Sequence, residues 1–426
     1  FCCGGWIKRN PIPKSYNDYS TFTKLSKVIE GELRGLLRDS NMSHDQDFEN
    51  DALVKARNFY QSCMDEHKIE QLGPRPMQDF IKKLALGVFA MMSTYYPAPA
   101  FFSIEVTNDH LNSTKHLIKV DQSGLSLQRE IYFKHPEMVD IYVEYMATIA
   151  KLLGSKCNTT SRMREIMDFE KQLAKFTTTA EDKADGIYRR MKLYKLINLV
   201  PQFPWLDHMQ AIFEGANVSE ADVVLATSPS YLRKVTKLLK QTSKELLSNY
   251  MVWQMIRDKI SFLSSPFREA RAYFNERITG VKDTDPRWRT CTGITNDNMG
   301  VPIGSLYVKS YFDQSAIEKA DSLGSKIGYA KYVVRPKELT SRFKKLNITP
   351  KTFFQNNVEV DKWVRHRLFA KLRKLVDKEK WPMFPQTINA MYQFYENEIG
   401  KVVSQSRHEL KPLAFALSCE QIGTYF

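Results

Sequence analysis

Two spacings of apolar residues divide this chain. Along most of its length, apolar residues recur every three or four positions, which is the spacing of an amphipathic helix. The first such segment has its apolar residues on one face, at Phe22, Leu25, Val28, Ile29, Leu33, Leu36 and Leu37. We expect helices over residues 20–38, 50–64, 76–92, 137–153, 162–175, 229–240, 244–279, 301–312 and 358–379. Pro266 should kink or split the helix at 244–279, because proline lacks the N–H group that a helix interior needs.

Three other segments alternate between apolar and polar residues with a period of two, which is typical of β-strands. Residues 100–107 and 115–122 flank a polar turn and predict a hairpin, and residues 387–395 predict a late strand. If one edge of the late strand stays open, its backbone can pair with an extended peptide. Asn389 would then add a side-chain amide, and Ala390 would let the peptide come close. The alternative is a strand buried in a small sheet, which the segment taken alone favours.

The composition is that of a folded protein, with 43% hydrophobic and 26% charged residues among 426. This length is enough for two or three domains. The net charge is +14, but the basic clusters at 342–345 and 365–380 lie among apolar residues at helical spacing. We interpret them as solvated helix faces and expect no nucleic acid as partner. The alternative, a nucleic-acid-binding helical protein, requires an affinity for nucleic acid that falls steeply as the salt concentration rises. The predicted fold class is mainly α, a large multi-helix lobe with a small β-hairpin and a late β-strand.

Signals of cellular location point outside the cell. No apolar run approaches the roughly 20 residues that cross a bilayer, so we expect no transmembrane segment in these residues. The sequence starts at Phe1 without an initiator Met or a signal peptide, and we expect it to be a fragment. Glycosylation sequences of the form Asn-x-Ser/Thr are more frequent than chance supplies, which favours a secreted protein. They lie at Asn41, Asn112, Asn158, Asn217 and Asn347.

The cysteines and histidines form no familiar catalytic or metal-binding motif. Six cysteines include no C-x-x-C pair, and their spacing does not reveal which of them form disulfides. None of the eight histidines belongs to an H-E-x-x-H motif. His408-Glu409 begins such a motif, but Pro412 occupies the position of the second histidine. His110 and His116 flank a predicted turn, and we expect no shared metal there. The residues by themselves therefore indicate a large helical extracellular domain, with no catalytic residue and no metal ligand.

A series of ordered motifs does carry a resemblance. From residue 3 to residue 399 the chain resembles the ectodomain of the neprilysin and endothelin-converting-enzyme family of zinc metallopeptidases. The sequence CGGWIKRNPIP at 3–13 is similar to the start of that ectodomain, and NAMY at 389–392 is similar to the substrate strand of the family. The remaining matches are at 56–64, 288–291, 296, 298–299, 304–308, 326–329 and 375–381.

The resemblance implies an ectodomain of two mostly helical lobes that enclose a cavity for peptides, one lobe carrying zinc and the other acting as a cover. It implies that residues 1–384 form the cover lobe and that 385–399 are the substrate-strand remnant of an incomplete catalytic lobe. Asn389 and Ala390 would hold the substrate backbone, and Cys63 would pair with Cys291. The implied location is extracellular, either secreted or as the ectodomain of a type II membrane protein.

The sequence departs from the family in two places. The match stops at Ile399, and residues 400–426 look like a non-family tail, so the helices that carry H-E-x-x-H and the third zinc ligand have no counterpart. Family helices are also missing between about residues 312 and 326. We therefore expect a member of a zinc metalloendopeptidase family that cleaves extracellular peptides, inactive as given and without a cofactor in this chain. The alternative is a non-enzymatic extracellular module that binds peptides or proteins.

Overall fold

The chain folds into two compact units, each drawn from more than one segment of the sequence. The computed structural model describes residues 11–12, 19–38, 51–85, 100–156, 158–179, 189–282, 285–312, 326–327, 329–377, 383–393 and 398–402. Unit 1 consists of residues 1–64, 284–351 and 377–426, and unit 2 consists of residues 65–283 and 352–376. The predicted boundaries at 384 and 399 divide the chain by family relationship rather than by packing, and they stay a prediction.

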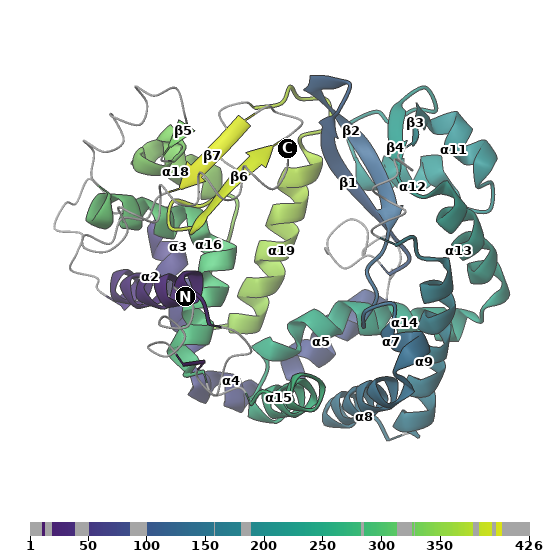
Figure 1. Ribbon diagram of the computed structural model, residues 1–426, viewed down its shortest axis with the longest axis horizontal. Coiled ribbons are helices and arrows are strands. Elements are labelled where there is room, and N and C mark those ends of the chain that lie inside the picture. The colour runs from purple at the N-terminus through teal and green to yellow at the C-terminus, as the bar shows by residue number, and fades with distance from the viewer. Residues whose placement is uncertain are drawn as a thin grey trace, which may run out of the picture. The chain divides into compact units, whose positions relative to one another are not determined.

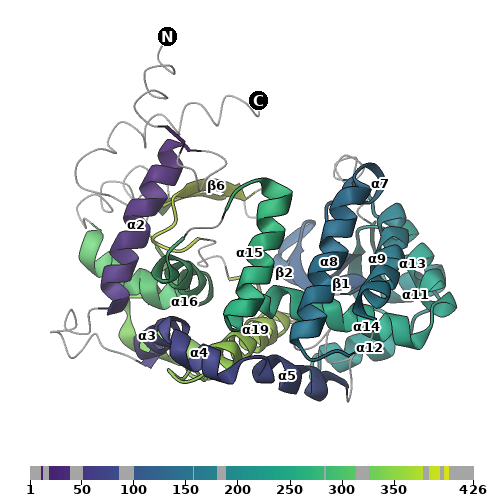
Figure 2. The same cartoon turned by 90° about the horizontal axis from the view of Figure 1, so that it is seen from below.

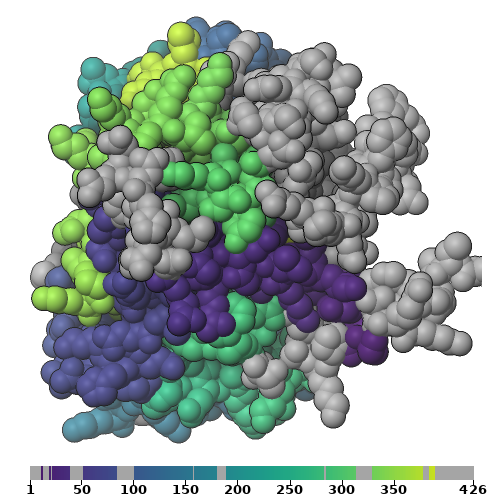
Figure 3. All heavy atoms as spheres, turned by 90° about the vertical axis from the view of Figure 1, so that its left-hand side faces the viewer, coloured from purple at the N-terminus to yellow at the C-terminus, as the bar shows by residue number. Residues whose placement is uncertain are grey.

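The described residues of unit 1 form several helices and the late strand. Its helices are α2 (Thr21–Arg38), α3 (Asp51–Met64), α16 (Arg287–Tyr311), the 3-10 helix η2 (Lys331–Val334) and α18 (Pro336–Phe343). Its strands are β5 (Lys326–Ile327), β6 (Asn389–Gln393) and β7 (Glu398–Val402). Figure 3 shows α2, in purple, on the surface of this unit beside green residues of α16.

The apolar face of α2 is narrower than its sequence predicts. Ile29, Leu33, Leu36 and Leu37 are buried, but Phe22 and Val28 are exposed. Val28 lies about 100° around the helix from Ile29, so it falls at the flank of the buried stripe.

Unit 2 is larger, and its described residues form mostly helices and a small sheet. Its helices are α4 (Glu66–Leu72), α5 (Arg75–Ala85), α7 (Ile131–Lys134), α8 (Pro136–Leu152), α9 (Thr159–Phe176), α11 (Leu193–Leu199), α12 (Trp205–Ile212), α13 (Pro229–Gln241), α14 (Lys244–Ile256), η1 (Arg257–Phe262), α15 (Ser265–Thr279) and α19 (Phe353–Phe369). Its strands are β1 (Phe102–Asp109), β2 (Asn112–Gln122), β3 (Arg189–Lys192) and β4 (Val223–Ala226). Helices α8 and α9 lie side by side (Figures 1 and 2). Residues 86–92 of the helix predicted over 76–92 lie outside the described residues.

The predicted hairpin is confirmed, and it belongs to a four-stranded sheet. Strands β1 and β2 pair antiparallel, and the strand order is β1-β2-β4-β3. Strand β4 runs parallel to β2, while β3 pairs antiparallel with β4. Neither β3 nor β4 was predicted, because each has only four residues and neither alternates clearly. The helices over 244–279 end and restart around Pro266, as its missing N–H group predicts.

A buried carboxylate organises the core of unit 2. Glu170 on α9 has no exposed surface. Its Oε1 accepts hydrogen bonds from the Ser126 N–H at 3.0 Å, the Tyr250 hydroxyl at 3.0 Å and the Gln254 Nε2 at 2.9 Å. The Tyr132 hydroxyl donates to Oε2 at 2.6 Å. Burial, together with the nearby Glu170 charge, raises the pKa of both tyrosines. The network thus joins three helices and a loop through one acceptor group.

Candidate peptide-binding strand

The late strand forms where its alternating sequence predicts it. Strand β6 pairs antiparallel with β7, from Asn389 opposite Val402 to Gln393 opposite Glu398. Strand β5 pairs parallel with β7, so the order is β5-β7-β6. Strand β6 is therefore at an edge, and no strand in the described part of the chain pairs with its other side. An edge of this kind offers backbone N–H and C=O groups to an extended peptide.

The structure places the two predicted substrate-binding residues at the start of this edge. Asn389 is the first residue of β6 and Ala390 is the second. Both therefore contribute backbone groups to the edge strand, which is the element that the sequence assigned to them. Their role in binding stays a prediction, and Phe394 and Tyr395 of the predicted strand lie outside the described residues.

A tight turn leads into β6. The Thr387 N–H donates to the Phe384 carbonyl at 3.0 Å, which closes a four-residue turn with Pro385 at its second position. Proline suits that position because its ring fixes φ near the value that the turn needs. Pro385 and Gln386 are buried. Only Ile388 separates this turn, residues 384–387, from the first residue of the strand.

The turn packs on α16, a helix with an internal kink. Met299 departs from helical geometry with φ −125° and ψ 26°, and Pro302 follows three residues later. Proline removes one backbone N–H and crowds the preceding turn of a helix, so it accounts for the kink. The sequence predicts a helix only over 301–312, whereas α16 already begins at Arg287. Its first half was missed because Thr, Asn and Gly are weak helix formers.

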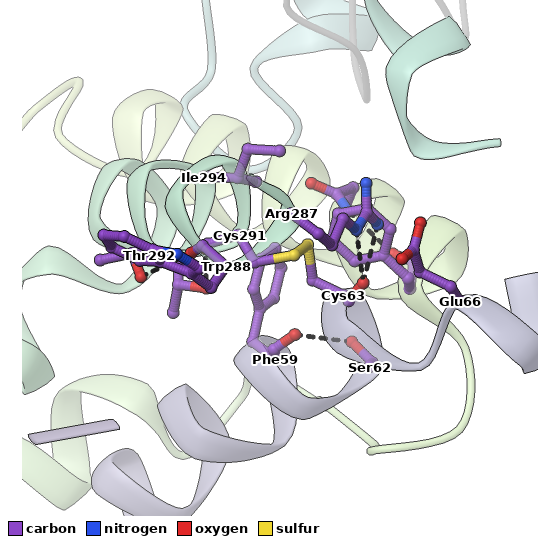
Figure 4. The surroundings of a disulfide bond; sticks show 12 residues. Phe59, Ser62, Cys63, Glu66, Arg287, Trp288, Cys291, Thr292 and Ile294 are labelled. Carbon is purple, nitrogen blue, oxygen red and sulfur yellow. Dashed lines mark hydrogen bonds between the residues drawn. A yellow bond between two sulfur atoms is a disulfide. The ribbon is translucent and has the colours of Figure 1, made fainter. Parts of the chain in front are cut away.

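A disulfide fixes the first half of α16 to α3. Cys63 and Cys291 are joined with a Cα–Cα distance of 5.7 Å, the pairing that the resemblance implies, and neither has exposed surface. The Arg287 guanidinium donates to the Cys63 carbonyl oxygen from Nε at 3.0 Å and from Nη2 at 2.7 Å (Figure 4). Carbonyls in the last turn of a helix have no intrahelical partner, so Arg287 caps the end of α3.

Helix α16 is also fixed to α2 by polar contacts. The Arg289 Nε donates to Glu30 at 2.6 Å, and the Tyr307 hydroxyl donates to Glu32 at 3.1 Å. Burial raises the pKa of Glu32, although the hydrogen bond from Tyr307 opposes that shift. With the disulfide, these contacts hold α16 at both of its halves. The helix is therefore a fixed support for whatever packs on its remaining face.

The chain does not supply a zinc site in the residues that the structure describes. No group of three His, Cys, Asp or Glu side chains there could hold a metal ion. The Nδ1 of His116 instead donates to the Lys374 carbonyl at 2.9 Å, so that ring orients a loop. The sequence also lacks H-E-x-x-H, the motif that places two histidine ligands on one helical face. These residues therefore do not fit zinc.

Four of the five predicted glycosylation sites lie in described parts of the chain, and all four residues are exposed. Asn158 caps α9, because its Oδ1 accepts from the Ser161 N–H. The Oδ1 of Asn112 accepts from the Thr114 N–H at the start of β2. Neither contact uses the Nδ2 atom to which a glycan is attached. Asn41 and the cysteines at 2, 3, 157 and 419 lie outside the described residues.

Within the described residues, no helix is both long enough and apolar enough to span a bilayer.

Solved structures, among them one of a zinc metalloprotease, share this fold. The inhibitor complex of Zmp1 from Mycobacterium tuberculosis superposes with a TM-score of 0.79 at 21% identity, over 95% of this chain and 67% of that one. PepO from Lactobacillus rhamnosis gives a TM-score of 0.78 at 18% identity, over 96% of this chain and 71% of that one. At these identities the likeness establishes the mainly helical fold that the sequence predicts.

Sequence comparison gives the family. The model of peptidase family M13 matches residues 1–330. Endothelin-converting enzyme 1 of Rattus norvegicus is 31% identical over 94% of this chain. Neprilysin-3 of Drosophila melanogaster is 29% identical over the same share. The chain belongs to peptidase family M13, a family of metallopeptidases, which confirms the resemblance seen in the sequence. It spans 59% of the rat relative and 58% of the fly relative.

Sequence reasoning found the strand but missed its support. The turn contacts α16 through the side chain of Gln386, which donates to Asn296 and Gly300, and through Pro385, which lies against Gly304. These contacts had no place in the predictions, although Asn296 and Gly304 belong to motifs of the resemblance. A usable signal was present: the three residues of α16 are spaced four apart, so they share one face of a helix. It was overlooked because the predicted helix began only at 301.

Proposed function

We propose that this chain is the peptide-receiving part of an extracellular M13 metallopeptidase, and that β6 receives the backbone of an extended peptide. The observation that carries the proposal is the position of β6 at the edge of its sheet, in a chain of a peptidase family. Strand addition uses main-chain hydrogen bonds for affinity, so it suits a peptidase whose substrates differ in sequence. The Asn389 amide would add a donor and an acceptor at the end of the strand.

The proposal separates binding from hydrolysis. Zinc supplies the activated water in a metallopeptidase, with ligands that include the H-E-x-x-H histidines. The 426 residues contain no such motif. We therefore propose that this chain by itself binds peptides without cleaving them, and that catalysis belongs to a longer polypeptide. A module that only binds peptides is the alternative biological role, and both roles require the same strand.

The extracellular location is part of the proposal. Exposed Asn-x-Ser/Thr sites at Asn112, Asn158, Asn217 and Asn347 support it, as does the disulfide between Cys63 and Cys291. Disulfides of this kind form in oxidising compartments. Expression in a secreting cell, followed by glycosidase treatment and mass measurement, tests it. A chain that stays unglycosylated and reduced when secreted would contradict the location.

Calorimetry tests the binding role. An unlabelled peptide of extended conformation is titrated into the wild-type chain and into the Asn389→Ala variant. We expect saturable binding by the wild type and about fivefold to tenfold weaker binding by the variant, the loss of roughly one hydrogen bond. Equal affinity of the two proteins would remove Asn389 from the site, and no binding to the wild type would contradict the proposal.

A hydrolysis assay tests the other half. The same peptide is incubated with the chain and zinc, with and without a chelator, and products are followed by mass spectrometry. We expect no cleavage in either sample. Turnover that the chelator abolishes would show that these residues build a metal site after all.

A further inference from the structure

The turn before β6 lies in a groove that only glycine permits. A Cβ atom built on Gly300 would lie 2.5 Å from two ring carbons of Phe384. A Cβ on Gly304 would lie 2.6 Å from Cδ of Pro385. Both distances are shorter than carbon atoms can approach without displacement, whereas Gly293 on the same helix has nothing within 4 Å. Gly300 and Gly304 are therefore needed for the close approach of the turn, and Gly293 is not.

A buried amide fastens the same turn. Gln386 is 3% exposed, and its Nε2 donates to the Gly300 carbonyl at 3.0 Å and to the Asn296 Oδ1. Both acceptors lie on the face of α16 that also carries Gly304. Polar bonds and steric fit thus act on one turn from one helical face. We call Asn296, Gly300, Gly304 and Gln386 the turn seat.

From this geometry we infer that the turn seat positions β6 for peptide pairing. Because only Ile388 connects the turn to the strand, a displacement of the turn moves the first residues of β6 with it. Strand pairing needs backbone donors and acceptors at hydrogen-bond distance along several residues, so a shift of a fraction of an ångström weakens all of them. The inference rests on the proposed function of β6, and it makes these four residues positioning residues rather than ligands of the peptide.

The contacts that hold α16 in place favour a positioning role for the turn seat. Helix α16 is anchored to α3 by the disulfide and to α2 by the Arg289 and Tyr307 contacts. An edge strand that is already ordered loses less conformational entropy when a peptide binds. The same hydrogen bonds therefore give a higher affinity for the peptide. The seat thus transfers the rigidity of α16 to a strand that is otherwise held by β7 alone among the described strands.

Three variants of the full chain test the inference. Gly304→Ala introduces the clash with Pro385, and Gly293→Ala is the matched control, since it makes the same change on the same helix in open space. Gly304→Ala combined with Pro385→Ala removes the two ring carbons that the new methyl group meets and leaves only the end of the Gln386 side chain to move aside, so it should restore most of the wild-type position. Each protein is measured by thermal unfolding, by calorimetry with the extended peptide and by hydrogen exchange of residues 389–393.

We expect Gly304→Ala to bind the peptide about tenfold more weakly and to exchange the β6 amides faster, as a less ordered edge strand should. Gly293→Ala should match the wild type in both measurements, and the double variant should recover most of the affinity. Wild-type affinity and exchange in Gly304→Ala would overturn the inference. So would equal losses in Gly304→Ala and Gly293→Ala, which would indicate a general effect on the helix.

The design separates this inference from the proposed function. If the wild type binds no peptide, the proposed function fails, and hydrogen exchange alone then decides whether the seat orders β6. If Gly304→Ala does not fold, Gln386→Met replaces it, because methionine keeps the length of the side chain and removes the two hydrogen bonds. Gln386→Met with unchanged β6 exchange overturns the inference, and faster exchange confined to residues 389–393 supports it.

Discussion

Replacing Glu170 by Met should destabilise unit 2 more than any other single change at an acidic residue on α9. Methionine has a similar length but offers no acceptor, so the Ser126 N–H and the hydroxyls of Tyr132 and Tyr250 lose their common partner. Each buried donor left without a partner costs about 1–3 kcal/mol. The partners are neutral, so no unpaired charge is left behind, and removal of the buried carboxylate returns part of the cost. For the donors together we expect a net loss of about 3–5 kcal/mol.

The assay is urea unfolding, followed by tryptophan fluorescence and circular dichroism. Glu165→Met is the matched control, because Glu165 lies on the same helix and its side chain is 51% exposed. We expect the control to stay within about 0.5 kcal/mol of the wild type. Glu170→Gln should fall between the two, since its remaining oxygen can still accept from Ser126, Tyr250 and Gln254. A Glu170→Met variant as stable as Glu165→Met would refute the claim that this network holds the core together.

Three further predictions concern stability and binding. Replacing Cys63 and Cys291 by Ala frees a loop of 228 residues and should lower the free energy of unfolding by about 2–5 kcal/mol, measured by denaturant titration; an unchanged midpoint would contradict it. Burial lowers the pKa of His208 to about 4, so the unfolded chain binds the proton first as the pH falls. Stability should therefore decline between about pH 6.5 and pH 4, and a His208→Gln variant should lose that dependence; an identical pH profile would be the contrary result. Peptides N-methylated at single positions should lose affinity at alternate residues only, because alternate N–H groups face the receiving strand; a uniform effect would exclude strand pairing.

The local sequence pattern predicted the elements whose conformation depends little on contacts with distant residues. The helices over 20–38, 50–64 and 229–240 and the hairpin were confirmed nearly to the residue, because amphipathic spacing and proline or turn signals coincide there. The last predicted helix, 358–379, is observed as α19, which ends at Phe369. The chain then turns, and Arg373 adopts φ 74° while its guanidinium binds Asp222. A contact across so many residues has no local signal.

The elements that sequence did not reveal depend on distant partners. Strand β4 is four apolar residues that suit a helix equally well, and only its position between β2 and β3 makes it a strand. For the candidate site, alternation predicted β6, and the family resemblance supplied its role. The turn seat could not be predicted from the sequence, because the requirement for glycine at position 304 comes from contact with Pro385, which lies far along the chain.

The path of the chain through the two units has a consequence for biosynthesis. The main segment of unit 2, residues 65–283, lies between the two cysteines of the disulfide in the sequence. Cys63 is in the last turn of α3, and Cys291 is in the first turns of α16. A ribosome therefore releases most of unit 2 before Cys291 exists, and the strand β6 emerges later still. We expect residues 65–283 to fold early and the disulfide to form after them, so that strand β6 is added last, next to helices that are already covalently joined.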